Sequence, residues 1–280
     1  MTSNETEPRL LQPYEVSRAA YKCGTIERKL LYYAALIVQK KPYTAGAEFS
    51  GYVAEFSLYD FCKKMLGNTS GVYFQTVKKA LKAITENTIV LADNDDELKV
   101  LSWLQEGYYS QKLNKVVLVF TDKIGKMFVE CRERFSLINP AVIGSLTSFY
   151  AMRYYEIGLS YSGFGSSWYF FRTIDELRQT FRIDSYTGAK GTNNFITKVV
   201  TQPLEELNAV NHDFRIDVVK IPDETDKRKL NAVKFVCTRT ATKKPKRRAK
   251  AGQADTADAY SAYLAQGGDL MQSITRGGKQ

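Results

Sequence analysis

Histidine is almost missing from this chain of 280 residues, which contains His212 and no other. Rolling-circle nicking enzymes depend on a two-histidine metal cluster to activate a tyrosine nucleophile, and a single histidine cannot build this cluster. Cysteine is scarce as well: Cys23, Cys62, Cys131 and Cys237 lie far apart with no CxxC pair. This spacing argues against a zinc ribbon and provides no disulfide framework. We therefore expect four reduced thiols and no metal site.

Long apolar runs and phosphate-binding loops are also missing. No stretch reaches 18 apolar residues, and the opening segment MTSNETEPRL lacks the basic and apolar regions of a secretion signal. We therefore expect a cytoplasmic protein without a membrane span. The glycines of GAKGT and SGFGSS do not have the spacing and lysine of a GxxxxGK[ST] loop. We expect no cofactor and no ATP-driven unwinding.

Positive charge is what the chain has in excess. The formal net charge is +10, which favours an anionic partner, either nucleic acid or an acidic membrane surface. From residue 239 to the end there are nine Lys and Arg against three Asp, so six of the ten excess charges lie there. Residues 1–238 are only mildly basic. Composition alone therefore does not identify DNA as the partner.

The first half of the chain has the element order of a winged helix-turn-helix. A helical period in TIERKLLYYAALIV is followed by a strand-like run, the short helix LYDFCKKML that Ser57 can cap and Gly67 can end, and a third helix in VYFQTVKKALKAIT. Two extended runs, Leu98–Tyr109 and Lys115–Thr121, then read as a hairpin around SQKLN. Opposite its apolar stripe, the third helix carries candidate DNA contacts at Gln75, Lys78, Lys79 and Lys82.

The same order returns in the second half. After the helix SLTSFYAMRYYEIGLSY and the strand WYFFR, Thr173 and Glu176 have the spacing of a capping box, about 116 positions after Ser57. A helix from about Asn193 to Leu207 follows, and Pro203 is expected to kink it or end it. Two strand-like runs close the copy. The predicted DNA contacts on or near this helix and at the second wing tip are Lys190, Asn193, Asn194, Thr197, Lys198, Thr201, Lys227, Arg228 and Lys229.

These patterns predict an α+β fold with two tandem winged-helix domains related by an internal repeat. We expect a flexible N-terminus over residues 1–13, domains over 14–140 and 141–240, and a disordered basic tail over 241–280. Each polar helix face could be an ordinary solvated surface, the basic turn a simple charged loop, and the run KKPKRRAK a solubilising tail. Two such faces in matching positions favour reading of the DNA major groove.

Several stretches resemble the plasmid replication initiators (Rep proteins) that bind iterons, over about Tyr14–Thr238. The most specific is SFYAMRYYEI (Ser148–Ile157), which resembles the family's opening helix of the second domain. WLQEGYYSQKLNKVVLVFTDKI is similar to the first wing, and TIDELRQTF and PLEELN to the second helix-turn-helix. KRKLNAVKF resembles the second-wing strand, although Lys227 departs from the usual Gly-Arg entry.

The resemblance implies a bacterial protein whose two winged-helix domains straddle a repeated element of double-stranded origin DNA. In that family the second domain makes the main sequence-specific contacts, while the first contacts the DNA backbone and forms homodimers in equilibrium with monomers. Family members also repress their own promoter and recruit a host initiator and the replicative helicase. Besides such an initiator, two alternatives remain: a tandem winged-helix transcriptional repressor and, least favoured, a strand-nicking enzyme.

The scarcity of histidine and the missing phosphate loop lead to a test. We expect the purified protein to protect direct-repeat DNA without hydrolysing nucleotide and without cutting either strand. Incubation of supercoiled and single-stranded repeat DNA with Mg²⁺ or Mn²⁺ and ATP measures both activities. Metal-dependent nicking that a Tyr→Phe substitution abolishes would contradict the expectation.

Overall fold

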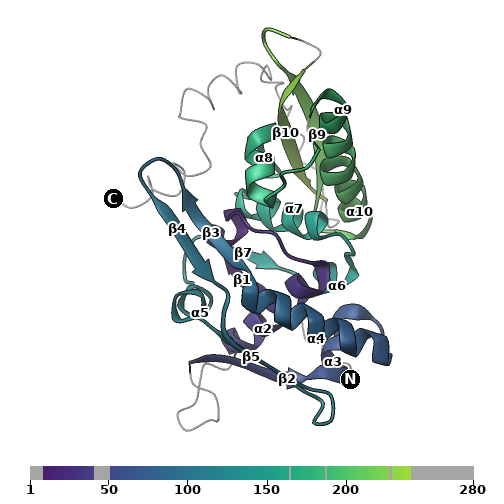
Figure 1. Cartoon of the computed structure of the whole chain (residues 1–280). Coiled ribbons are helices and arrows are strands. Elements are labelled where there is room, and N and C mark those ends of the chain that lie inside the picture. Colours follow the sequence, from purple (N-terminus) through teal and green to yellow (C-terminus); the bar gives the residue numbers. More distant parts are fainter. Residues whose placement is uncertain (1–8, 41–50, 164, 187, 227–228, 241–280) are drawn as a thin grey trace.

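The computed structural model of this chain describes residues 9–40, 51–163, 165–186, 188–226 and 229–240, with the backbone alone at 188–190. The predicted tail, 241–280, and most of the predicted flexible N-terminus lie outside the described residues. In Figure 1 the first half of the chain forms a lower group of helices and strands and the second half an upper group, with α7 (Phe149–Ser160) between them. None of the described helices combines the length and apolarity needed to span a membrane.

The first half contains the predicted succession of helix, strand, two helices and hairpin. Its hairpin joins the earlier strand in an antiparallel sheet with the order β2-β6-β5. The elements are α2 (Thr25–Lys40), β2 (Tyr52–Ser57), α3 (Leu58–Phe61), the π-helix η1 (Cys62–Leu66), α4 (Gly71–Glu86), β5 (Leu104–Ser110) and β6 (Lys115–Phe120).

The second half follows the same succession, and its antiparallel sheet has the order β8-β10-β9. In both sheets the strand before the short helix therefore pairs with the last strand of the hairpin. The elements that follow α7 are β8 (Ser167–Thr173), α8 (Ile174–Phe181), α9 (Gly188–Phe195), the π-helix η2 (Ile196–Thr201), α10 (Gln202–Val210), β9 (Phe214–Pro222) and β10 (Leu230–Arg239).

The predicted helix boundaries at the two short helices are confirmed. Ser57 Oγ accepts a hydrogen bond from the Asp60 amide at 3.1 Å, and Gly67 ends the helix in the left-handed conformation at φ 66°. In the second half Thr173 Oγ1 accepts from the Glu176 amide at 3.1 Å, while the Glu176 carboxylate accepts from the Thr173 amide at 2.6 Å. These side chains satisfy backbone groups that a helix end leaves unpaired.

The helix predicted to begin near Asn193 begins five residues earlier, at Gly188, and helical structure continues to Val210 through α9, η2 and α10. Pro203 therefore lies inside the helical segment Gly188–Val210 and does not end it. The Gln202 amide donates to the Thr197 carbonyl, five residues back, so the hydrogen bonding widens just before the proline. A proline lacks the amide hydrogen that a regular helix needs, and a π turn is one way for a helix to take up such a defect.

The long extended run predicted at Leu98–Tyr109 is two strands rather than one. It is divided at Trp103, which is 1% exposed and whose ring meets the Tyr21 ring edge-on at 5.3 Å. Before this residue β4 (Leu98–Ser102) pairs with β3 (Thr88–Asp93), a strand that the sequence analysis did not predict, and after it β5 pairs with β6. Anchoring of a large aromatic ring in the core directs the two parts of the run to different sheets.

Part of the predicted flexible N-terminus is also an ordered strand, which corrects that expectation for residues 10–13. Here β1 (Leu10–Pro13) pairs antiparallel with β7 (Phe135–Ile138), and Leu10 and Gln12 are buried. Burial of Leu10 and the hydrogen bonds of the Gln12 side chain offset the entropy lost when a chain end is ordered. The remaining elements of this region are α1 (Tyr14–Arg18), α5 (Asp122–Val129) and α6 (Pro140–Ser145).

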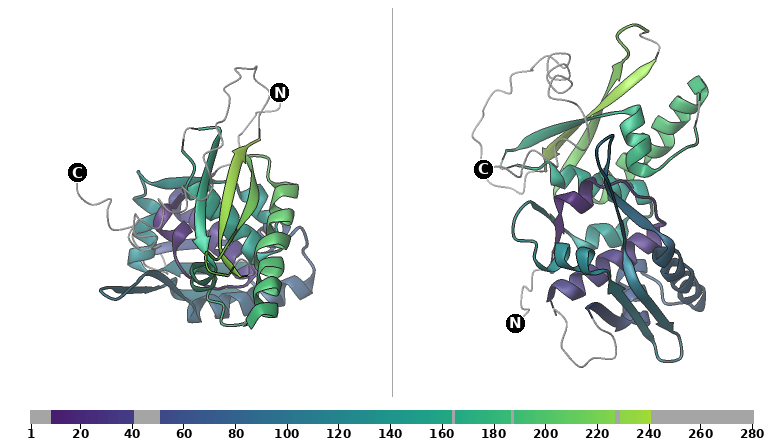
Figure 2. Two further views of the ribbon diagram at one scale, coloured as in Figure 1. Left: turned by 90° about the horizontal axis from the view of Figure 1, so that it is seen from above. Right: turned by 60° about the vertical axis from the view of Figure 1, so that its left-hand side comes forward.

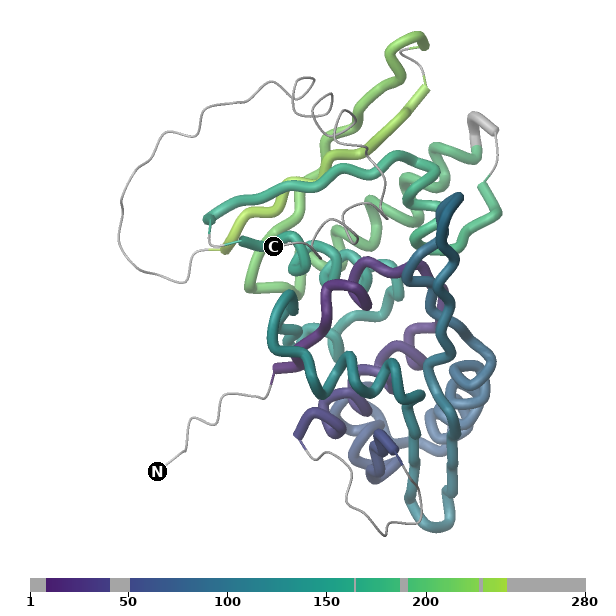
Figure 3. Tube along the Cα trace, turned by 90° about the vertical axis from the view of Figure 1, so that its left-hand side faces the viewer, coloured from purple at the N-terminus to yellow at the C-terminus, as the bar shows by residue number. Residues whose placement is uncertain are grey.

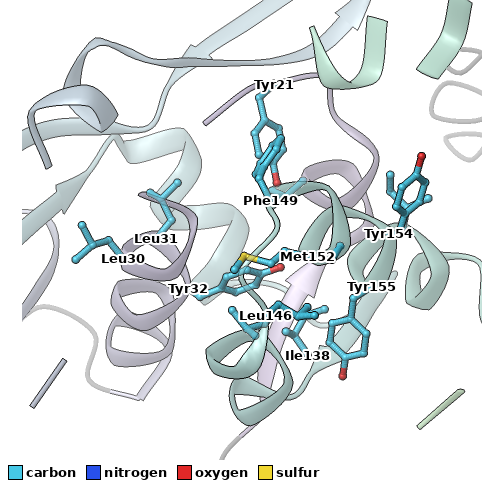
Figure 4. Packing of buried hydrophobic residues seen from close by; sticks show 14 of the residues in the cluster. Tyr21, Leu30, Leu31, Tyr32, Ile138, Leu146, Phe149, Met152, Tyr154 and Tyr155 are labelled. Carbon is cyan, nitrogen blue, oxygen red and sulfur yellow. The ribbon is translucent and has the colours of Figure 1, made fainter. Parts of the chain in front are cut away.

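One apolar core runs through both halves, and α7 lies at its centre. Ten of the 12 residues of α7 are buried. Figure 4 shows Phe149 and Met152 of this helix near Tyr21 and Tyr32 of the first half. On its other side, Tyr155 stacks on Phe214 with ring centroids 5.8 Å apart. The two halves are therefore packed against a shared helix and are not joined by a linker alone.

Close packing between α5 and β2 predicts a stability change at Gly125. A Cβ added to this glycine would lie 2.1 Å from Cγ of Tyr52, whereas a Cβ at Gly144 of α6 would lie 3.5 Å from its nearest neighbour. We expect Gly125→Ala to lower the free energy of unfolding by about 1–3 kcal/mol through overpacking. The matched Gly144→Ala substitution, also in a helix, should leave it unchanged or raise it by up to about 1 kcal/mol.

Chemical denaturation of the two variants and the parent protein measures these differences. Equal effects of the two substitutions on the free energy of unfolding would contradict the packing argument.

Candidate nucleic-acid interface

Helix α4 presents a polar, cationic face to solvent. Val77, Leu81 and Ile84 are buried against the core. The four side chains that the sequence places opposite this stripe are all exposed: Gln75, Lys78, Lys79 and Lys82. Burial of the apolar stripe fixes the rotation of the helix, and this rotation turns the polar face outward. Lysine and glutamine on such a face can reach phosphates and base edges.

The turn of the first hairpin lies beside this face. Gln75 Nε2 donates to Gln111 Oε1 at 3.3 Å. The turn is fixed by Asn114, whose backbone is left-handed at φ 50°. Its Oδ1 accepts from the Tyr59 amide at 2.9 Å, and its Nδ2 donates to Ser57 Oγ at 3.0 Å. The wing is therefore tied to the start of α3 by side-chain hydrogen bonds.

Lys112 is exposed on the same turn and was not among the predicted contacts. Its position next to Gln111 sets a cation beside the face of α4. The lysine in the predicted hairpin turn SQKLN was the available signal, because a basic residue at a wing tip is placed to meet the DNA backbone.

The continuous helix of α9 and η2 presents the second polar face. Phe195 and Val199 are buried, while the predicted contacts on the opposite side are exposed: Asn193, Asn194, Thr197, Lys198 and Thr201. Thr197 Oγ1 donates to the Asn193 carbonyl at 3.0 Å. This hydroxyl therefore has an intrahelical partner for its hydrogen, which leaves it as an acceptor toward a ligand.

The remaining predicted contacts are only partly described. Lys229 is exposed, with 76% of its side chain accessible and an Asp226 carboxylate oxygen 3.9 Å from Nζ. The side chain of Lys190 and the whole of Lys227 and Arg228 lie outside the described residues. Of the three contacts predicted in the turn between β9 and β10, Lys229 is therefore the one that the structure describes.

The turn that leads into α9 is held by Arg178 of α8. Its guanidinium donates to the backbone carbonyls of Ser185 and Tyr186, each at 2.6 Å. The same guanidinium lies over the Phe195 ring, 4.8 Å from its centroid. A charged group that binds the turn and packs on the following helix fixes the direction in which α9 leaves the turn.

The two polar helices lie toward the same side of the molecule. In the right-hand view of Figure 2 and in Figure 3, α4 is at the lower right and α9 at the upper right. One partner that lies along this side could therefore contact both helices at once.

The described residues offer no cluster of three His, Cys, Asp or Glu side chains that could hold a metal ion. Burial raises the pKa of the Cys62 thiol to about 11 and that of Cys237 to about 12. Both thiols are therefore protonated at neutral pH, a form that binds metals poorly. The predicted contacts that the structure describes on this surface offer amide, hydroxyl and ammonium groups.

Comparisons with known proteins identify one matching family and similar solved structures. The family model described as initiator replication protein, WH1, matches residues 10–158. The crystal structure of Pi initiator protein in complex with iteron DNA superposes with a TM-score of 0.61 at 18% identity, over 82% of this chain and 96% of that one. A structure of domains 2 and 3 of RctB has a TM-score of 0.48 at 13% identity, over 78% and 82% of the two chains. The comparison with curated proteins found no match.

Proposed function

The chain belongs to the family of initiator replication proteins whose first domain is a winged helix, and from this premise we propose that it starts plasmid replication by binding direct repeats of origin DNA. The ligand is double-stranded DNA with iterons, read in the major groove by α4 and α9. In the related fold of Pi initiator protein, the solved complex contains iteron DNA. Binding and recruitment, without a chemical step, constitute the proposed activity.

We infer that the second half is another winged helix related to the first by an internal repeat. The shared sheet order, β2-β6-β5 and β8-β10-β9, supports this inference. In each half a hydroxyl residue, Ser57 or Thr173, caps the start of the short helical segment. A residue in the left-handed conformation, Gly67 or Arg182, follows its end. A structural repeat accounts for these parallels, which local sequence alone does not require.

The observation that carries the proposal is the pair of exposed polar helices on one side of the molecule. The major groove admits one α-helix, and neighbouring grooves on one side of a duplex are one helical turn apart. Asn194 and Lys198 lie one turn apart on the exposed face of the second helix. We propose that they contact base edges, and that Lys229 of the second wing contacts phosphate.

Other activities are proposed from family resemblance: repression of its own promoter, a homodimer in equilibrium with monomers, and recruitment of a host initiator and the replicative helicase in the bacterial cytoplasm. Residues 241–280 would add non-specific attraction to DNA through their positive charge. Replication itself separates the initiator from a plain repressor. We expect the gene together with its flanking direct repeats to sustain a plasmid that has no other origin.

Transformation with this plasmid measures the initiator activity, and a copy carrying Asn194→Ala and Lys198→Ala serves as the control. Repression of a reporter promoter without maintenance of the plasmid would favour the repressor.

Base reading and charge attraction predict different behaviour for three variants. Asn194→Ala and Lys198→Ala should each weaken binding to the cognate repeat by about 1–3 kcal/mol and relax the preference at one base pair. Lys229→Ala should weaken binding to all sequences alike and reduce the slope of log K against log salt by about one. Because all three side chains are exposed, the substitutions should change stability by less than about 0.5 kcal/mol.

Binding titrations on cognate and scrambled repeats at several salt concentrations measure both quantities. Equal losses on the two DNAs for Asn194→Ala and Lys198→Ala would show that this helix does not read the sequence.

A further inference from the structure

The carboxylate of Glu156 is the centre of a buried polar cluster that joins the two halves of the protein. It is fully buried, as is Arg153. Arg28 Nε donates to Oε1 at 2.9 Å, and Arg153 Nη1 donates to Oε2 at 2.6 Å. Three neutral side chains complete the set of donors: Gln12, Tyr21 and Tyr32. Five donors on two oxygens saturate the carboxylate, which has about four lone-pair positions.

Arg153 lies on α7 beside Glu156, and the other four donors come from three segments of the first half. Gln12 belongs to β1, Tyr21 follows α1, and Arg28 and Tyr32 lie one turn apart on α2. Glu156 belongs to α7, whose other side packs on the second half. The cluster therefore attaches the shared helix at one point to β1, to α2 and to the connection between α1 and α2.

The charges of the cluster fix the orientation of α7 relative to the first half, and not only its position. Burial alone would raise the pKa of Glu156, but the charges of Arg28 and Arg153 outweigh burial and lower it. The glutamate is thus ionised. An ionised group away from water must keep its hydrogen bonds, and each of these bonds has a preferred direction. Apolar contacts around α7 would allow the helix to slide or rotate slightly. The hydrogen bonds to Glu156 do not allow this movement.

A short chain of contacts connects the cluster to both DNA-facing helices. α4 packs on α2, which carries Arg28 and Tyr32. α10, continuous with α9, packs on α7, which carries Glu156. A change at the carboxylate would therefore alter the placement of α4 relative to α9 and leave the exposed face of each helix unchanged.

We propose that Glu156 is a positioning residue that sets the spacing and orientation between α4 and α9, and thereby the length of DNA that the protein reads as one unit. This inference rests on the proposed function, because it concerns how two DNA-reading helices bind one duplex together. Two binding elements held at a fixed separation act as one site, and the gain in affinity is lost when the separation on the ligand is wrong.

Two variants test the role of the carboxylate. Glu156→Gln removes its charge and leaves two guanidinium groups without their counter-ion. Tyr32→Phe is milder: it removes one donor hydroxyl and keeps the ring over which Arg28 lies, 4.2 Å from the centroid. Tyr154→Phe is the matched control, because it removes a buried hydroxyl from α7 that has no hydrogen-bond partner among the described residues.

The probes are the cognate repeat, each half of it alone, and repeats with one, two or five base pairs inserted between the parts that footprinting assigns to the two helices. Five base pairs rotate the parts by about half a helical turn. The measured quantity is the ratio of the Kd on each inserted repeat to the Kd on the intact repeat, for protein whose folded fraction has been measured by circular dichroism.

For the parent protein and Tyr154→Phe we expect the five-base-pair insertion to raise Kd on the order of 100-fold. For Glu156→Gln this ratio should fall by about tenfold, and Tyr32→Phe should lower it in the same direction, with Kd on each isolated half unchanged. A purely structural defect would raise Kd on every probe by one factor and leave the ratio unaltered.

An unchanged ratio in folded Tyr32→Phe and Glu156→Gln overturns the positioning role. If Glu156→Gln does not fold, Tyr32→Phe against Tyr154→Phe decides alone. Failure of the proposed function is a different result, because the parent protein would then bind intact and scrambled repeats equally well.

Discussion

The fold depends on keeping one carboxylate ionised where water does not reach it. Removing a single partner from a buried ion pair costs about 3–5 kcal/mol, a large part of the stability of a typical protein. Glu156 therefore requires its donors to be in place, and this requirement helps to order the segments that carry them. Gln12 is the clearest example: its amide donates to Glu156 and Ser17, and its carbonyl oxygen accepts from Arg28. Strand β1 is held in the core by a polar side chain as well as by Leu10.

Hydrophobic burial and side-chain hydrogen bonds position the exposed polar helix faces and the turns beside them in different ways. On α4 and on the helix of α9 and η2, burial of one stripe selects the residues that face outward. The exposed face can then vary in sequence without loss of the core, since surface substitutions change stability little. The turns beside these helices depend instead on single groups, Asn114 in the first half and Arg178 in the second. In each half, therefore, one buried stripe orients a helix and one side chain fixes the turn beside it.

Sequence predicted the features that depend on local pattern. The caps at Ser57 and Thr173 and the exposed faces of both helices follow from spacing within one or two turns, and the family resemblance is confirmed by the matching family model. The division of the run at Trp103 depends on a partner in another element, Tyr21. Hydrophobic periodicity could not locate buried Arg28, because it treats an arginine on a helix as solvent-facing. Both features depend on contacts between residues that are far apart in the chain, and local sequence patterns do not reveal such contacts.

The segment Ser148–Ile157, which resembled a known family most specifically, has a physical reason for its pattern. Ser148 Oγ accepts from the Ala151 amide at 3.3 Å and caps α7, and the segment includes both Arg153 and Glu156. Within residues 1–238, positive charge cannot replace the geometry that this helix imposes, because this part holds only four of the ten excess charges. In the proposed complex, residues 1–238 therefore add only modest non-specific attraction to phosphates, and the specificity of this part would depend on amide, hydroxyl and ammonium groups that meet base edges at the correct separation. For two such faces to act on one duplex, the helix between them, α7, has to be held in orientation as well as in position. Directional hydrogen bonds to a buried charge accomplish this better than apolar contacts.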